Sequence, residues 1–189
     1  MKIHLVLLLF FGSTDAVLKD EFRVQGLKDV VPDYALFEGE SFAGYIPTTP
    51  GFKHTSDSSI FFWLFEPDAP IDDNSVTVWL NGGPGCSSLA AGLLFEMGPI
   101  MTPHITPGPT LPASTKYDKL SFNPYSWTNA TRMLYIEQPV GTGFSFGPEP
   151  EDETDVAADF YNFLLNFYTV FPYLKDVRLF IFGESYAGE

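Results

Sequence analysis

Short apolar runs alternate with polar stretches rich in proline and glycine along most of this chain. Five runs are rich in β-branched and aromatic residues and too short for helices, a pattern that predicts strands. They lie at 41–46, 59–65, 75–80, 132–137 and 178–182. Only a polar turn separates the second run from the third, so we expect these two to be antiparallel neighbours. After Arg178, the last run has no polar positions, and it predicts a buried strand that ends in a sharp turn.

Helical periodicity is clearest between positions 152 and 171. Apolar residues recur there at spacings of three and four, and acidic residues gather at the N-terminal end, where the helix dipole favours them. This pattern predicts an amphipathic helix with an aromatic stripe facing the core. A shorter helix is predicted at 89–97, closed by Gly98 and Pro99. Residues 17–34 show no clear period and predict an irregular arm. Hairpin strands followed by strand, helix and strand predict an α/β sheet whose later strands are parallel.

The first sixteen residues have the features of a targeting segment. Lys2 precedes an apolar run at 3–11, and small residues follow as far as Ala16. A membrane span needs about 20 apolar residues, so we predict a removable signal peptide at 1–16 and one domain at 17–189. The protein is therefore expected in the secretory pathway, either extracellular or vacuolar/lysosomal. In that setting, the tripeptide at 129–131 predicts N-glycosylation of Asn129.

Composition limits the partners that we expect. The chain has 10 Lys plus Arg against 24 Asp plus Glu, a net charge of −14. This excess repels phosphates and anionic lipid surfaces, so nucleic acid and membranes are not predicted partners. Acidification would relieve part of the self-repulsion, which suits an acidic compartment. The single cysteine, Cys86, is unusual for an oxidising compartment; either it is a buried free thiol or its partner lies outside this sequence.

Two glycine-punctuated segments carry candidate chemistry. Residues 81–88, Asn-Gly-Gly-Pro-Gly-Cys-Ser-Ser, expose backbone N–H groups in front of a predicted helix, which favours an anion site. No Gly-Lys-Ser/Thr follows, so it is not a phosphate-binding Walker loop, and we predict no cofactor and no metal. Ser185 lies between Gly183 and Ala187 at a strand end, as the nucleophile of an α/β-hydrolase does. Ligands bind at the carboxyl ends of parallel strands, so we expect the loops after Leu80, Glu137 and Phe182 to meet.

Taken together, these segments resemble the serine carboxypeptidase family. Four motifs occur in the family's order, namely WLNGGPGCSS at 79–88, NPYSW at 123–127, EQPVGTGFS at 137–145 and GESYAG at 183–188. The resemblance implies an α/β-hydrolase fold, here truncated after the nucleophile elbow. It also implies an enzyme that removes single residues from the free C-termini of peptides or proteins through acyl-enzyme chemistry. No oligomeric state is implied.

The resemblance also implies roles for individual residues. Ser185 would be the nucleophile, and the N–H groups of Gly83 and Tyr186 would form the oxyanion hole. The terminal carboxylate of the substrate would be held by Asn81, Gly82, Glu96 and Glu184. Two close glutamates cannot both ionise cheaply, so one would keep a proton and donate a hydrogen bond to that carboxylate. Peptide binding should then weaken from acidic to neutral pH. Cys86 would pair with a later cysteine.

The sequence departs from the family in its general base. An α/β-hydrolase needs an acid and a histidine after the serine, whereas His4, His54 and His104 all precede Ser185. We therefore expect this chain to be the N-terminal part of a carboxypeptidase and to be inactive alone. Two alternatives remain open: a carboxypeptidase-like acyltransferase, and a secreted, non-catalytic module that binds peptide C-termini.

Overall fold

The computed structural model describes residues 14–31, 39–67, 69–71, 74–102 and 120–189. Most of the predicted signal peptide, including His4, lies outside these ranges, and so does His104. Within them, no helix has the length and apolar character needed to cross a membrane.

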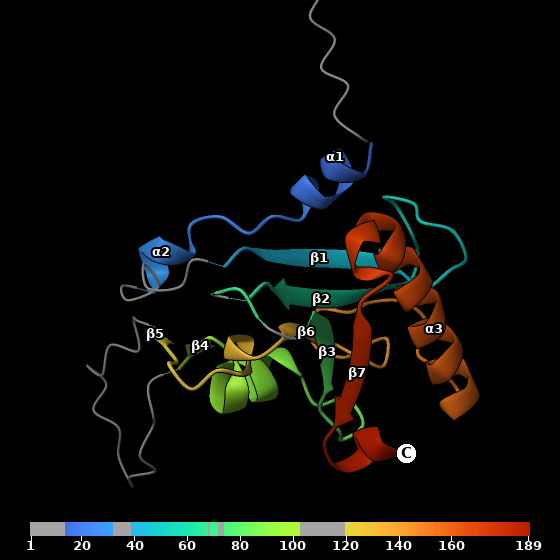
Figure 1. The fold of residues 1–189 in the computed structure, drawn as a ribbon. Coiled ribbons are helices and arrows are strands. Elements are labelled where there is room, and N and C mark those ends of the chain that lie inside the picture. Colours follow the sequence, from blue (N-terminus) through green and yellow to red (C-terminus); the bar gives the residue numbers. More distant parts are fainter. Residues whose placement is uncertain (1–13, 32–38, 68, 72–73, 103–119) are drawn as a thin grey trace, which may run out of the picture.

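The central feature is a five-stranded mixed sheet in the order β1-β2-β6-β3-β7 (Figure 1). Each predicted strand is present to within about a residue at either end, and the neighbours β6, β3 and β7 run parallel as expected. Both β1 and β6 are antiparallel to β2. The strands are β1 (Ser41–Pro47), β2 (Ser59–Phe65), β3 (Ser75–Leu80), β6 (Arg132–Ile136) and β7 (Arg178–Gly183).

The predicted pairing of the second and third strands is wrong. β6 lies between β2 and β3 and pairs with both. Residues 66–74 connect β2 to β3. This connection is long enough to leave room for one strand between them, and β6, which comes much later in the chain, occupies that place. A separate two-stranded sheet contains β4 (Ile100–Met101) and β5 (Ser121–Phe122).

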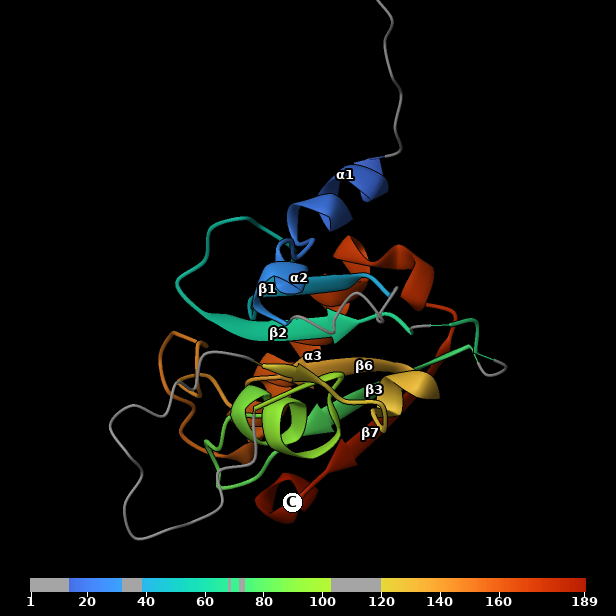
Figure 2. The same ribbon diagram turned by 90° about the vertical axis from the view of Figure 1, so that its left-hand side faces the viewer.

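Helices cover both faces of the large sheet, as Figures 1 and 2 show. The predicted long helix is α3 (Glu153–Val170), and its N-cap Asp152 accepts hydrogen bonds from the Thr154 and Asp155 N–H groups. The opposite face carries the helix Leu89–Met97, which has the predicted bounds but π-type geometry. Its Leu93 N–H donates to the carbonyl oxygen of Ser88, five residues earlier, at 3.0 Å.

The N-terminal arm is more regular than the sequence suggested. It contains α1 (Thr14–Glu21) and α2 (Leu27–Val30), so the expectation of an irregular arm is wrong for these segments. Between them, the arm pairs with the outer edge of β1, where the Ala43 N–H donates to the Phe22 carbonyl at 2.8 Å. Short 3₁₀ turns occupy Trp127–Asn129, Pro172–Leu174 and Ser185–Gly188.

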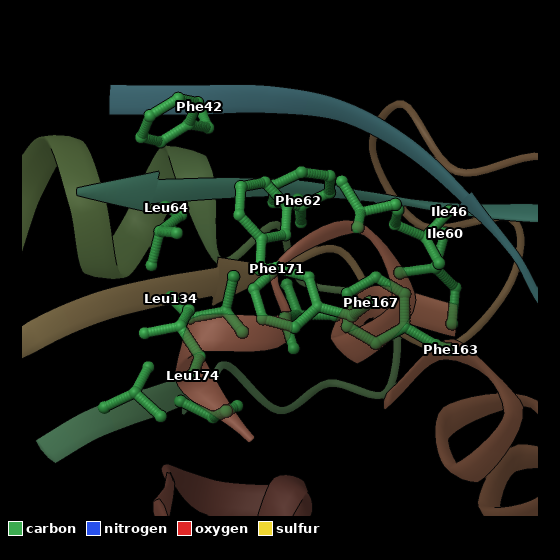
Figure 3. Close-up of a cluster of buried hydrophobic side chains, with 14 of the residues drawn as sticks. Phe42, Ile46, Ile60, Phe62, Leu64, Leu134, Phe163, Phe167, Phe171 and Leu174 are labelled. Carbon is green, nitrogen blue, oxygen red and sulfur yellow. The ribbon is translucent and has the colours of Figure 1, made fainter. Parts of the chain in front are cut away.

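Aromatic side chains fill the core between α3 and the sheet (Figure 3). The predicted stripe supplies Phe163, Phe167 and Phe171, all buried, and Phe62 of β2 packs among them. The ring centroid of Phe62 lies 5.4 Å from that of Phe167 and 5.7 Å from that of Phe171. These edge-to-face contacts pack α3, and the residue that follows it, against β2.

β7 is exposed, which corrects the prediction of a buried strand. Leu179, Phe180, Ile181 and Phe182 keep 37%, 40%, 51% and 45% of their surfaces accessible. In the described part of the chain, β7 lies at the edge of the sheet and pairs with β3. Among the described residues, its ring contact is that of Phe182 with Trp127, at 5.6 Å. Backbone hydrogen bonds to β3 hold this strand in place in the described chain, and burial of its side chains contributes little.

Candidate active site

The chain turns sharply after β7, and Ser185 lies at the turn. Its φ angle is +58°, and in the described part of the chain it is the one non-glycine residue with a positive φ. A side chain in this left-handed region costs about 1–2 kcal/mol. Gly183 permits the turn, since a methyl group there would lie 2.5 Å from the Ala187 carbonyl oxygen. The expected strand-to-turn geometry is present, and the serine hydroxyl is presented at the end of the strand.

The glycine-rich loop after β3 lies directly against this turn. The Glu184 N–H donates to the Leu80 carbonyl oxygen at 3.0 Å. A methyl group on Gly82 would lie 2.6 Å from the Tyr186 nitrogen and 3.0 Å from the Ser185 Cβ. Only a glycine allows so close an approach, so the structure brings together the two segments that the sequence predicted to meet.

The loop itself is closed by its own hydrogen bonds. The Asn81 N–H donates to the Ser88 Oγ at 3.0 Å, and the Cys86 N–H donates to the Gly82 carbonyl oxygen at 2.9 Å. Gly83 has a φ of +114°, in the region that favours glycine, and it is exposed. Cys86 is a free, exposed thiol, so the alternative of a buried free cysteine is wrong.

Asn81 has a fixed orientation beside the turn. Its Oδ1 accepts hydrogen bonds from Trp79 Nε1 at 2.8 Å and from the Gly92 N–H at 3.1 Å. Its Nδ2 must then point the other way, where it donates to Glu184 Oε2 at 2.7 Å. Sequence patterns assigned Trp79 and Gly92 no role here, although a glycine in the middle of a helix often marks a close approach.

Glu96 joins this group from the end of the helix Leu89–Met97. Desolvation by burial, and then the charge of Glu184, raise the pKa of Glu96, while a hydrogen bond from Asn81 opposes the shift. The two glutamates therefore lie close enough to influence each other, as the sequence analysis expected. Both residues keep exposed surface despite this partial desolvation, so a ligand can reach them.

A cleft of about 400 Å³ opens beside the turn. Its walls come from the glycine-rich loop, from the segment after β6, from the first turn of α3 and from Tyr186. The Tyr186 hydroxyl donates to Glu153 Oε1 at 2.7 Å, which links the residue after Ser185 to the start of α3. All three loops predicted to meet at the carboxyl ends of the strands thus surround one opening.

The predicted glycosylation site and a histidine that precedes Ser185 lie away from this group. The Nδ1 atom of His54 lies 3.5 Å from Glu21 Oε2, and the His54 ring contacts the ring of Phe52. None of its described contacts is with Ser185. Asn129 is exposed in a 3₁₀ turn, where its Nδ2 donates to the Pro124 carbonyl oxygen at 2.9 Å. Its glycosylation stays a prediction.

Comparisons with known proteins agree with this geometry. The family model described as serine carboxypeptidase matches residues 32–189. A carboxypeptidase Y homolog of Arthroderma benhamiae is 42% identical over 160 residues, which are 84% of this chain and 29% of the relative. The lysosomal protective protein of Mus musculus is 39% identical over 189 residues, 97% of this chain and 35% of the relative.

A solved structure supports the same assignment. Kex1, a prohormone-processing carboxypeptidase from Saccharomyces cerevisiae, is similar with a TM-score of 0.69 and 33% identity, over 90% of this chain and 36% of that one. The chain thus spans about a third of the length of the relatives that it matches. Fold and sequence together show that the chain has the α/β-hydrolase fold and belongs to the serine carboxypeptidase family.

Proposed function

We propose that the complete protein containing this chain is a serine carboxypeptidase. It releases C-terminal amino acids from peptides at acidic pH through an acyl-enzyme on Ser185. The observation that carries the proposal is the contact between the glycine-rich loop and the strained turn at Ser185, in which Gly82 has no room for a methyl group. A serine hydroxyl beside unshielded N–H groups suits attack on a carbonyl carbon.

Oxyanion stabilisation comes from the backbone. As the Ser185 Oγ attacks, negative charge develops on the carbonyl oxygen, and N–H groups already aimed at that oxygen stabilise it. In our proposal, those donors are the N–H groups of Gly83 and Tyr186. They come from two separate segments, which the tight approach of Gly82 to Tyr186 holds together.

Selectivity for the chain terminus comes from a site for the terminal carboxylate. We assign it to Asn81, the Gly82 N–H, Glu96 and Glu184. With its pKa raised, Glu96 keeps a proton at acidic pH and acts as a hydrogen-bond donor. An endopeptidase has no need of such a group, because its substrates present no carboxylate there.

Activation of Ser185 needs a histidine and an acid. Among the described residues His54 contacts Glu21 and Phe52 instead, so we propose that another part of the complete protein supplies both groups. Residues 17–189 alone would then be inactive. We further propose that Cys86 pairs with a cysteine elsewhere in that protein, and that the protein works in an acidic secretory compartment on peptides with free C-termini.

The test uses the complete protein and a blocked dipeptide with a free C-terminus. Turnover should be measurable at about pH 5, and Ser185→Ala should lower kcat by about 10⁴-fold or more. Ser121→Ala is the matched control. The Ser121 hydroxyl makes a weak contact of 3.5 Å with the Met101 carbonyl oxygen, and Ser121 is far from Ser185 in the sequence.

Four results would contradict the proposal. Full turnover by Ser185→Ala would rule out Ser185 as the nucleophile. Cleavage of the amidated dipeptide as fast as the free one would rule out a site for the terminal carboxylate. Transfer of the acyl group to an alcohol in preference to water, or binding of the free C-terminus without turnover, would favour one of the two alternatives instead.

A further inference from the structure

Glu137 is a fully buried acid to which the mechanism above gives no role. It directly follows β6, and 0% of its surface is exposed. Its Oε1 accepts hydrogen bonds from Ser87 Oγ at 2.5 Å and from the Leu89 N–H at 3.1 Å. Its Oε2 accepts one from the Phe144 N–H at 3.0 Å. One carboxyl group therefore ties the glycine-rich loop to the loop that follows β6.

The burial of this group depends on those donors. Burial of an ionised carboxyl group is costly unless hydrogen bonds or an opposite charge compensate for lost water. No Lys or Arg in the described ranges forms an ion pair with Glu137. Compensation comes instead from hydroxyl and backbone donors, and the Leu89 N–H adds the positive end of a helix. A donor that moved away would leave the acid unsatisfied, so the acid holds its donors in place.

The second loop is shaped to enclose this carboxyl group. Gly143 has a φ of +54°, and a methyl group there would lie 1.1 Å from Glu137 Oε2. Ser145 Oγ donates to the Glu137 carbonyl oxygen at 2.5 Å and accepts from the Phe61 N–H at 2.8 Å. Side chain and backbone of Glu137 are thus both anchored, the latter to β2 of the sheet.

The glycine-rich loop transmits this anchoring to the site. Its ends are joined by the hydrogen bond from the Asn81 N–H to Ser88 Oγ, and a second bond joins Cys86 to Gly82 inside the loop. These two bonds couple the positions of the residues between them. Fixing the loop at Ser87 therefore also fixes where its first glycines lie.

We infer that Glu137 is a positioning residue for the oxyanion hole. Through the Ser87 hydroxyl, its carboxylate fixes the loop 81–88, and with it the Gly83 N–H, against the turn at Ser185. The inference rests on the proposed function and gives Glu137 no contact with substrate. Loss of the carboxylate should weaken stabilisation of the transition state and leave peptide binding in the ground state almost unchanged.

The test compares Glu137→Gln with the wild type in the complete protein. Glutamine has the same shape, but its amide cannot accept from every donor around the buried acid. We expect kcat on the blocked dipeptide to fall about 10- to 100-fold, with KM within about threefold of wild type. Phosphonylation of Ser185 by a fluorophosphonate, whose phosphoryl oxygen enters the same hole, should slow by a similar factor.

Glu66→Gln is the matched control at the other end of β6. Its carboxylate accepts from Arg132 Nε at 2.6 Å and from the Tyr173 hydroxyl at 2.5 Å. This variant should lower the unfolding temperature and leave both rates unchanged. If Glu137→Gln does not fold, Ser87→Ala replaces it, because it removes one donor and leaves two. We expect that variant to lose about 3- to 10-fold in kcat at unchanged KM.

The possible outcomes separate the two claims. The inference is overturned if the variant measured keeps kcat and labelling rate within twofold of wild type, or if it acts mainly through KM. A wild type that labels at Ser185 but does not cleave blocked dipeptides would reject the proposed function, while the labelling rates would still decide the role of Glu137. A wild type that neither labels nor cleaves overturns both.

Discussion

The face of the sheet under α3 and the edge strand β7 are held in opposite ways. Under α3, rings from the helix and from β1 and β2 bury one another almost completely. β7 has an equally apolar sequence, yet its side chains stay 37–51% accessible in the described chain. Packing secures the first region, whereas hydrogen bonds to β3 secure the second. Ser185 therefore follows a strand that depends on backbone pairing in the described chain.

The register of β7 matters more for the site than its burial does. Gly183 pairs with Leu80, and this alignment places Glu184 next to the start of the glycine-rich loop. A slip by one residue would turn every β7 side chain to the other face and move Ser185 away from Gly82. The chemistry thus depends on an alignment that side-chain packing does little to enforce here.

The largest effect on stability should come from the packed region. Phe167→Ala removes a buried ring whose centroid lies 4.6 Å from that of Phe171, so it should lower the free energy of unfolding by about 3–5 kcal/mol. Denaturant unfolding of the complete protein measures this, and kcat of the folded protein should not change. Phe180→Ala on β7 should cost less than half as much if β7 keeps the 40% accessibility of Phe180 found in the described chain. An equal loss at both positions would show that other residues cover β7 and would abolish the contrast.

A smaller effect, on activity instead of stability, is expected at the contact between the loop and the turn. A methyl group in Gly82→Ala would meet backbone atoms of Glu184 and Tyr186 at 2.6 Å and force the two segments apart. We expect kcat/KM to fall about 100-fold, because a displacement of about 1 Å can cost that much. Gly51→Ala is the control: it has open space but a φ of +83°, so stability should fall and kcat/KM should not. Unchanged activity in Gly82→Ala would contradict the assigned geometry.

The smallest effect concerns pH. Because burial and the charge of Glu184 raise the pKa of Glu96, this group is protonated on the acidic side and ionises as pH rises. The protonated form donates to a substrate carboxylate, whereas the ionised form repels it, so KM should rise about tenfold from about pH 4.5 to 7.5. Glu96→Gln stays neutral and should flatten that profile. A flat profile in the wild type would count against the carboxylate site.

Much of the fold could be predicted because its signals are local. Runs of β-branched and aromatic residues gave the strands, and the spacing of Phe163, Phe167 and Phe171 gave the buried face of α3. Strand order was harder, because a nine-residue link cannot show that β6 will enter between β2 and β3. The exposure of β7 was missed for a related reason: an apolar run indicates a strand, but its neighbours depend on the rest of the sheet.

The candidate site divides in the same way. Loops at the carboxyl ends of parallel strands were expected to meet. The hydrogen bond from Asn81 to Glu184 joins two of these loops, the one after β3 and the one after β7. Residues that orient others were missed, since Gly92, which orients Asn81, and Ser87, which donates to Glu137, lie in other segments. For Glu137 a signal did exist, namely an acid placed directly between a buried apolar strand and a glycine-rich loop.

The distance along the chain between the two halves of the site also sets an order of events during synthesis. Asn81 and Glu184 are 103 positions apart. Ribosomes add about 5–20 residues per second, so dividing 103 by these rates gives an interval of about 5–20 s between the two segments. While that stretch is being translated, the glycine-rich loop exists without its serine, and the nascent polypeptide carries no assembled nucleophile that could attack its surroundings.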